Sequence, residues 1–330
     1  MSEKKNDNKK RRPTIYDLAK LANVSPGTVS RVLNNRHNVR STTRNRILEL
    51  AREIGLKPQA TARTREIAVV TAPQYTDRFH GYSNTLTAHT AFALTERNVG
   101  MLLPSDPLKQ LNEYFMDGII AITYGPKIYD MLCEIEKKVP VVYLDNFEAK
   151  PEQHVICSDH WDSGYKAAKC FLEHGLKRLG YIGGESAPFR ERFNGYAKAI
   201  KEFGLEPQKR LMALIPPSES LYNVINRLVK NKVEAIYVPG CSMQVIEALH
   251  VLTNVIGLKV PEDISIIGGE SEGVSVFQSP PLTCLNEPLN QMADAAVRTV
   301  LSLAEGNKKL EPKTVFPVEL IERESVAWRT

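Results

Sequence analysis

The stretch Thr14–Asn34, TIYDLAKLANVSPGTVSRVLN, constrains the fold more than any other part of this 330-residue chain. Its pattern predicts two short helices joined by a tight turn. In the first helix the apolar residues recur at helical spacing and form a single stripe, made of Ile15, Leu18, Ala19 and Ala22. A stripe of this width can be buried on one side only, so a partner helix is expected.

Both predicted helices carry signals at their ends. Thr14 is a suitable N-cap, and Asp17, three residues later, completes a capping box. Asn23 suits the turn because asparagine tolerates the left-handed conformation. Ser25 is the expected cap of the second helix, followed by Pro26 at the first helical position, where a backbone N–H is not needed.

A third helix is expected from the cap residue Ser41 to Gly55. This layout predicts a helix-turn-helix DNA-binding head with Pro26–Asn34 as the recognition helix, although a bundle that merely packs has the same periodicity. Charge favours DNA binding. Residues 1–65 hold 16 Lys and Arg against 5 Asp and Glu, whereas the remaining 265 residues hold 27 against 33. A basic head on an acidic body is typical of a nucleic-acid-binding protein.

The chain resembles transcription regulators of the lactose-repressor (LacI/GalR) family. The pattern T-I-x-D-x-A-x-x-A-x-V-S-x-x-T-V-S-R-V-L-N is present without a gap. Later segments extend the resemblance to nearly everything after Arg12, among them Asp117–Ile120, Pro140–Asp145, Arg190–Gly195 and Val260–Gly268. The resemblance implies a disordered basic arm (1–12), a helix-turn-helix domain (13–57), a hinge (58–66) and an effector-binding and dimerisation domain of two lobes (67–330).

From Ile67 onward, short strands rich in Val and Ile alternate with amphipathic helices, which indicates parallel sheets covered on both faces. The expected fold class is therefore α/β, with an all-α head and a two-lobed body like that of periplasmic binding proteins. The short segment between Leu103 and Gly118 predicts a truncated helix. The expected strands are 67–71, 100–103, 118–122, 141–144, 179–182, 211–215, 235–238 and 264–267.

Arg31 is the residue expected to read DNA bases, because its guanidinium can fork onto O6 and N7 of a guanine. Pro26 and Gly27 occupy early positions of the recognition helix, but their side chains cannot hydrogen-bond a base edge. The resemblance adds contacts that mainly position the backbone, from Tyr16, Ser25, Thr28 and Asn34. It also adds Ala60 and Arg63 of the hinge, although the leucine that relatives wedge into the minor groove is absent.

For an effector, the resemblance points to Asp145, Arg192 and Glu270. Asp145 and Glu270 follow apolar strands, where parallel sheets place ligands. Two carboxylates and a guanidinium suit a polyol, whose hydroxyls can donate to the carboxylates while Arg forks across them. Tyr82, or Phe79, is a candidate for stacking on the ligand. The alternatives are salt bridges for the charged residues and core packing for the aromatic ones.

Other function classes lack their motifs. Gly183-Gly184 belongs to neither a dinucleotide nor a P-loop pattern, and no G-x-S-x-G nucleophile elbow occurs. His154 and His160, six residues apart in a loop-like stretch, have no metal-binding spacing. The sequence therefore predicts no enzyme, no cofactor and no metal. Five scattered cysteines, no long apolar run and no signal-peptide h-region predict a cytoplasmic protein without a membrane partner.

The expected function is a homodimeric regulator that binds a near-palindromic double-stranded operator. We expect it to repress a carbohydrate-use operon under the control of a sugar-like effector held between the lobes. The resemblance implies that the helix Ser242–Val255 lines the dimer face through Val245, Ile246, Leu249, Val251 and Leu252, although burial within the lobe would explain several of these residues equally well. The alternatives are a corepressor-type sensor of a purine or similar metabolite, and a sugar-binding module without DNA regulation.

Overall fold

The computed structural model describes residues 13–36, 38–56, 65–71, 81–122, 125–146, 149–214, 219–240, 243–270, 273–307 and 309–329. The arm, most of the hinge with Ala60 and Arg63, and Phe79 lie outside these residues. The chain divides into two compact units. The first comprises Met1–Gln74, Ala91–Val142 and Val297–Leu310, and the second Tyr75–Thr90, Tyr143–Ala296 and Glu311–Thr330.

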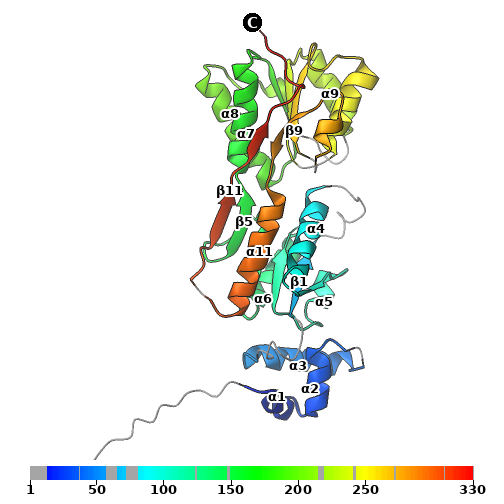
Figure 1. Ribbon diagram of the computed structural model, residues 1–330, viewed down its shortest axis with the longest axis vertical. Helices are drawn as coiled ribbons and strands as arrows, with labels where there is room; N and C mark the ends of the chain where they lie inside the picture. Colours follow the sequence, from blue (N-terminus) through cyan, green and yellow to red (C-terminus); the bar gives the residue numbers. More distant parts are fainter. Residues whose placement is uncertain are drawn as a thin grey trace, which may run out of the picture. The chain divides into compact units, whose positions relative to one another are not determined.

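The N-terminal region is helical, with α1 (Ile15–Ala22), α2 (Pro26–Leu33) and α3 (Ser41–Glu53) grouped together (Figure 1). The predicted capping box is confirmed, because the backbone N of Asp17 donates to the Thr14 hydroxyl at 3.3 Å and the backbone N of Thr14 donates to the Asp17 carboxylate at 2.8 Å. Asn23 is left-handed with φ of 52°, as predicted. The three helices share one apolar core that includes Leu18, Val29, Val32, Ile47 and Leu48.

The prediction that Ser41 caps the third helix is wrong. Ser41 is the first residue of α3, and the N-cap is Arg40, whose side chain makes no capping hydrogen bond. A serine one position inside the helix cannot accept from the N-terminal amides in the way an N-cap does.

The first sheet has the strand order β11-β5-β4-β3-β1-β2. Its strands are β1 (Glu66–Val70), β2 (Gly100–Leu102), β3 (Gly118–Ala121), β4 (Val141–Leu144), β5 (His154–Ser158) and β11 (Lys313–Phe316). Pairing is parallel for β1 with β2 and β3, and for β5 with β11. The associated helices are α4 (Tyr82–Thr95), α5 (Pro107–Gln110), α6 (Pro126–Glu136) and α11 (Leu289–Ala304). The four-residue α5 confirms the predicted truncation.

The second sheet has the order β12-β10-β9-β8-β6-β7, and only β12 is antiparallel to its neighbour among the pairings of the described strands. Its strands are β6 (Leu179–Gly183), β7 (Met212–Leu214), β8 (Ala235–Val238), β9 (Ser265–Gly269), β10 (Thr283–Asn286) and β12 (Glu319–Ile321). Its helices are α7 (His160–Glu173), α8 (Ala187–Glu202), α9 (Leu221–Lys230) and α10 (Gln244–His250), which continues as a π-helix over Val251–Ile256.

The α/β fold class is confirmed: a helical N-terminal region is followed by a two-lobed body with mostly parallel sheets. All eight predicted strands are present, but β5, β10, β11 and β12 were not predicted. The stretch predicted to be loop-like around the two histidines is regular, since His154 begins β5 and His160 begins α7. No helix among the described residues is both long and apolar enough to cross a bilayer.

The apolar residues assigned to a dimer face on α10 belong mainly to the interior. Val245, Leu249, Val251 and Leu252 are buried in the core of the second unit, and Ile246 packs against that core. A side chain buried in its own core cannot also cover a partner, so this assignment is wrong for the four buried residues.

Candidate nucleic-acid interface and effector site

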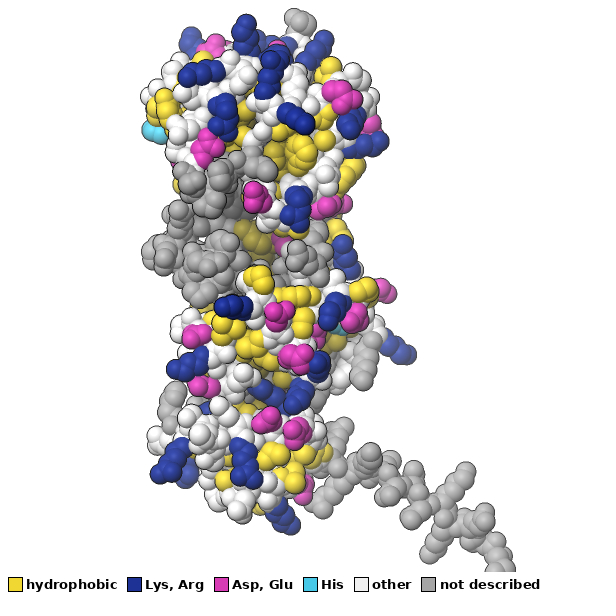
Figure 2. Space-filling model, turned by 180° about the vertical axis from the view of Figure 1, so that it is seen from behind, with side chains coloured by type: hydrophobic (Ala, Val, Ile, Leu, Met, Phe, Trp, Pro, Cys, Tyr) yellow, Lys and Arg dark blue, Asp and Glu magenta, His cyan; other side chains and the backbone are white. Residues whose placement is uncertain are grey.

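The outward face of α2 is polar, because its apolar residues Val29, Val32 and Leu33 are buried against the other helices. The side chains predicted to touch DNA remain accessible: Arg31, Asn34 and Ser25 are exposed, Thr28 is half-buried, and Tyr16 is 64% exposed. Figure 2 shows Lys and Arg side chains on the visible surface of the helical region. The geometry therefore offers one long cation on a small polar surface, as a helix reading a major groove requires.

Three of these polar side chains already have local partners. The Ser25 hydroxyl accepts from the backbone N of Thr28 at 3.1 Å and lies 2.9 Å from the Thr28 hydroxyl. The Asn34 amide donates to the carbonyl of Ser30 at 2.7 Å. These bonds fix the two ends of α2. A surface hollow of about 490 Å³ lies beside them, lined by Tyr16, Ala19, Lys20, Asn23, Val24, Ser25 and Pro26.

A second group of polar residues is buried within the second unit. We call it the Arg192 cluster, and it consists of Tyr82, Asp145, Ser158, His160, Arg192 and Glu287. Asp145 and Glu287 follow the strands β4 and β10, and Ser158 ends β5. The cluster thus forms at the carboxyl ends of strands, where open parallel sheets bind ligands.

Arg192 and Glu287 are the central ion pair of the cluster. Nη2 of Arg192 donates to Oε1 of Glu287 at 2.6 Å, and Ser158 Oγ donates to Oε2 at 2.5 Å. Burial by itself would raise the pKa of Glu287, but the charge of Arg192 and these hydrogen bonds outweigh it and lower that pKa. The same carboxylate outweighs the effect of burial on Arg192 and raises the guanidinium pKa. Both groups are therefore charged in the folded protein.

Asp145 connects this pair to an aromatic hydroxyl. Its backbone is left-handed, with φ of 51°, and its carboxylate accepts from the Tyr82 hydroxyl and from the backbone N of Ser158 at 3.3 Å. His160 Nε2 lies 3.3 Å from the same carboxylate. Burial, followed by the negative charge of Asp145, raises the pKa of Tyr82. Tyr82 is therefore a neutral donor here.

The position of Arg192 is fixed by close packing of α7 and α8, which lie side by side (Figure 1). A Cβ on Gly164 would lie 1.7 Å from the carbonyl oxygen of Arg192, and one on Gly195 would lie 1.9 Å from that of Trp161. Only glycine, which has no Cβ, allows the backbones of α7 and α8 to come this close at positions 164 and 195. The helix α8 begins at Ala187, before Arg192. Arg192 consequently lies inside a regular helix.

The ligand atoms of Asp145, His160 and Glu287 lie within 4.8 Å of one another, close enough to hold a metal ion. However, Arg192 already balances Glu287, and its positive charge would oppose a cation at the same carboxylate. A neutral, hydroxyl-bearing ligand suits the cluster better. The Nε of Arg192 is buried and has no hydrogen-bond partner among the described residues, so one strong donor is available.

Glu270 has a different set of contacts from the other predicted effector residues. It forms an ion pair with Arg323 at 2.9 Å and accepts from Cys284 Sγ at 3.0 Å and from the backbone N of Ser275 at 3.4 Å. Burial would raise the pKa of Glu270, but these partners lower it to about 2. Its role in effector binding stays a prediction.

Sequence reasoning found Tyr82, Asp145 and Arg192 but missed Ser158, His160 and Glu287. These three residues lie in or just after β5 and β10, and neither strand was predicted from the sequence. Asp159 caps α7 by accepting from the backbone N of Asp162, which marks a strand-to-helix junction at His160. Glu287 directly follows the short strand β10, whose pattern TCLN is too brief to stand out.

Comparison with known proteins identifies the two regions. Residues 14–59 match the family described as "Bacterial regulatory proteins, lacI family", and residues 168–326 match "Periplasmic binding protein-like domain". The chain is 29% identical over 342 residues to the HTH-type transcriptional regulator DegA of Bacillus subtilis, covering 95% of this chain and 98% of DegA. It is also 29% identical over 344 residues to the transcriptional repressor PurR of Pasteurella multocida, covering 96% and 99%.

The chain belongs to the lacI family of bacterial regulatory proteins. As a lacI-family member it is a DNA-binding transcriptional regulator. A solved structure of the transcriptional regulator CelR with cellobiose is 25% identical, with a TM-score of 0.69 and coverage of 95% of this chain and 100% of that one. The lac repressor dimer bound to operator and an anti-inducer has a TM-score of 0.68 at 20% identity, with coverage of 96% and 100%, and shares the fold.

Proposed function

We propose that this lacI-family regulator represses a carbohydrate-use operon and responds to a small sugar-like effector bound at the Arg192 cluster. The observation that carries the proposal is the composition of the cluster. It combines two carboxylates, a guanidinium, a phenol and an imidazole in a buried setting. Adjacent hydroxyls of a sugar can donate to the carboxylates and accept from Arg192 and Tyr82, whereas an apolar ligand would leave these groups unsatisfied.

The charge state of the cluster supports an uncharged polyol rather than an ionic ligand. Glu287 and Arg192 neutralise each other, and Tyr82 is a neutral donor to Asp145. An ionic ligand would compete with the Arg192–Glu287 pair for its partners in a low-dielectric setting. The similar regulator CelR, whose structure was solved as a complex with cellobiose, is in line with a sugar.

The second candidate is a purine or a related metabolite that acts as a corepressor. It is favoured by the relatives named PurR, which match over nearly the full chain. A planar base would use the same donors and acceptors and could stack on an aromatic ring. Phe189 lies under the guanidinium of Arg192, at 5.7 Å from ring centre to Cζ, and offers such a surface.

A thermal-shift screen of the full-length protein against sugars, purine bases and nucleosides tests this assignment. A ligand present at about 100 times its dissociation constant adds about 2.7 kcal/mol to stability. Arg192→Lys keeps the positive charge but removes the planar guanidinium that can donate two parallel hydrogen bonds. The ligand should therefore no longer raise the melting temperature of this variant. Arg190→Lys, in the same helix with an exposed side chain, is the matched control. An equal shift in Arg192→Lys, or no hit in either class, would contradict the proposal.

We further propose that the regulator acts as a homodimer on a near-palindromic operator. One head offers few base contacts, since Arg31 is the one side chain of α2 suited to a bidentate base contact. A two-fold dimer repeats these contacts about 34 Å away, one helical turn along the DNA. Sedimentation at micromolar concentration should give a mass of about 74 kDa, twice that of the 37.0 kDa chain. A monomer that binds operator tightly would contradict this.

A further inference from the structure

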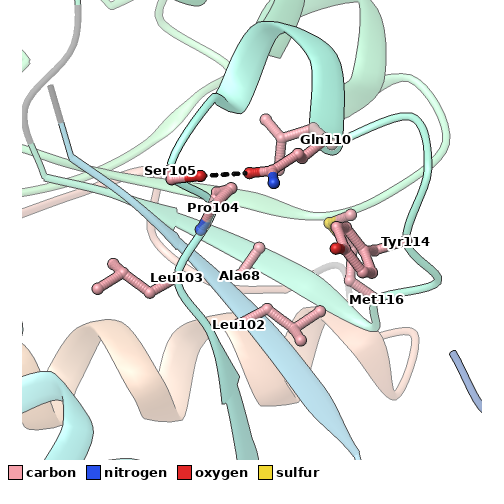
Figure 3. A pocket seen from close by; sticks show the side chains of 9 residues that line it. Ala68, Leu102, Leu103, Pro104, Ser105, Gln110, Tyr114 and Met116 are labelled. Atoms are coloured by element: carbon pink, nitrogen blue, oxygen red, sulfur yellow. Dashed lines mark hydrogen bonds between the residues drawn. The ribbon is translucent and has the colours of Figure 1, made fainter. Parts of the chain in front are cut away.

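A cavity of about 160 Å³, open to solvent on the side of the exposed residues Leu103 and Ser105, lies in the first unit beside the shortened helix α5. Figure 3 shows Tyr114 and Met116 close together on one side and the hydrogen-bonded pair Ser105 and Gln110 on another. The lining residues are Ala68, Leu102, Leu103, Pro104, Ser105, Gln110, Leu111, Tyr114 and Met116.

The cavity exists because little chain covers this part of the sheet. Between β2 and β3 the chain forms only the single turn α5. Ala68, on β1 between β2 and β3, has too small a side chain to fill the space. A longer helix or a larger residue at position 68 would close it, so the space follows from two separate features of the sequence.

The chemistry of the walls limits what can bind. The described residues that line the cavity carry no charge, and most of them are apolar. Ser105 Oγ lies 3.4 Å from the Gln110 side-chain oxygen, and the Tyr114 hydroxyl is a further polar group on another side of the cavity (Figure 3). An apolar cavity of about 150 Å³ is large enough to bind benzene. These properties fit an uncharged molecule the size of one ring, with a single hydroxyl.

Residues 111–116, several of which line the cavity, also contact the helical N-terminal region. Phe115, between the lining residues Tyr114 and Met116, is buried in the core formed by α1, α2 and α3. The Asn35 side chain binds both backbone groups of Phe115, donating to its carbonyl at 3.2 Å and accepting from its N at 3.0 Å. A conformational change in residues 111–116 would therefore directly alter their contacts with α1, α2 and α3.

A second contact links α3 to the cavity wall. Nη2 of Arg52 donates to the carbonyl of Leu111 at 3.1 Å and to that of Tyr114 at 3.5 Å. Leu111 and Tyr114 thus face the cavity with their side chains while their carbonyl groups hold α3. Filling the cavity would restrict the same residues that carry these hydrogen bonds.

We propose that this cavity is a second small-molecule site, distinct from the Arg192 cluster, which takes an uncharged single-ring alcohol and acts on the DNA-binding helices through residues 111–116. Occupancy holds the segment in the conformation that Asn35 and Arg52 bind. The effect is regulatory, because the ligand touches neither α2 nor the residues of the Arg192 cluster.

Phenol is the probe for the binding step, measured by titration calorimetry on the full-length protein. Phenol should bind the wild type, and the filling variants Leu102→Phe and Ala68→Leu, which act from different strands, should each weaken binding by at least about 10-fold. Leu108→Phe makes the same change on α5 at a residue that does not line the cavity, and should bind normally. Benzoate, a charged ring of similar size, should bind at least about 10-fold more weakly than phenol.

If the wild type does not bind phenol, or if both filling variants bind it as tightly as the wild type, the proposed site is wrong. The regulatory step is measured by hydrogen exchange. At about 100 times its dissociation constant, phenol should slow exchange of the Phe115 amide and of α3 by up to about 100-fold. In Asn35→Ala the effect on α3 should fall by at least about 5-fold. Binding without any change in exchange of the Phe115 amide and α3 would overturn the coupling.

Discussion

Arg192 and Glu287 form a buried ion pair with 2.6 Å between Nη2 and Oε1, although 95 residues separate them in the chain. Removing one member of such a pair leaves an uncompensated buried charge and costs about 3–5 kcal/mol. Alanine substitutions here would mix loss of stability with loss of binding. Conservative changes such as Arg192→Lys therefore report on the site more directly.

The close packing of α7 and α8 predicts a strong effect of Gly164→Ala. A Cβ at this position would lie 1.7 Å from the carbonyl oxygen of Arg192, so the helices must separate. Overpacking of this kind costs about 1–3 kcal/mol, measured as a lower urea midpoint. Gly27→Ala, inside α2, is the control, because a Cβ there meets only Ser25 Oγ at 3.8 Å, and it should not lower the urea midpoint. Equal midpoints for the two variants would contradict the packing argument.

The ion pair between Glu270 and Arg323 predicts a pH dependence of stability. Although burial opposes ionisation, hydrogen bonds from Cys284, Arg323 and Ser275 lower the pKa of Glu270 from 4.5 to about 2. Because the folded pKa is the lower one, the stabilisation is complete above pH 4.5 and is lost as the pH falls towards 2. Wild type and Glu270→Gln should therefore differ in urea midpoint at pH 7 and converge near pH 2. A difference that stays constant with pH would show that the carboxylate charge is not responsible.

Base recognition is predicted to depend on Arg31, the exposed cation of α2. Arg31→Ala should remove the preference for one base pair in each half-site, at a cost of about 1–3 kcal/mol against the preferred base. Binding-site selection from a random duplex library measures this directly. Arg46→Ala removes an equal charge from the exposed surface of α3 and should return the wild-type motif with weaker overall affinity. Recovery of an unchanged motif by Arg31→Ala would disprove the assignment.

Much of the helical region could be predicted from the sequence because its signals are local. Thr14, Asp17, Asn23, Ser25 and Pro26 each act within four residues of their own position, and the structure has all of them in the predicted roles. Ser41 is the exception. Serine also occurs in the first turn of helices, and only the backbone angles and the capping hydrogen bond distinguish the two positions.

The Arg192 cluster was only partly predictable, for the opposite reason. Arg192 and Asp145 could be located from a motif and a strand end, but their partners come from strands of four or five residues. Glu287 pairs with Arg192 through tertiary packing that leaves no periodic signal. The residues assigned to the dimer face failed similarly, since an apolar stripe such as that of Val245 and Leu249 reads the same whether its own core or a partner covers it.

The central claim is that an effector at the Arg192 cluster controls DNA binding. The most direct test is operator affinity by fluorescence anisotropy, using a site obtained by selection and the effector obtained from the thermal-shift screen. Effector should change wild-type affinity by about 5–150-fold. Arg192→Lys should bind the operator as tightly as effector-free wild type and show no response. If Arg192→Lys responds to the effector like the wild type, or binds the operator more weakly than effector-free wild type does, the Arg192 cluster is not the effector site.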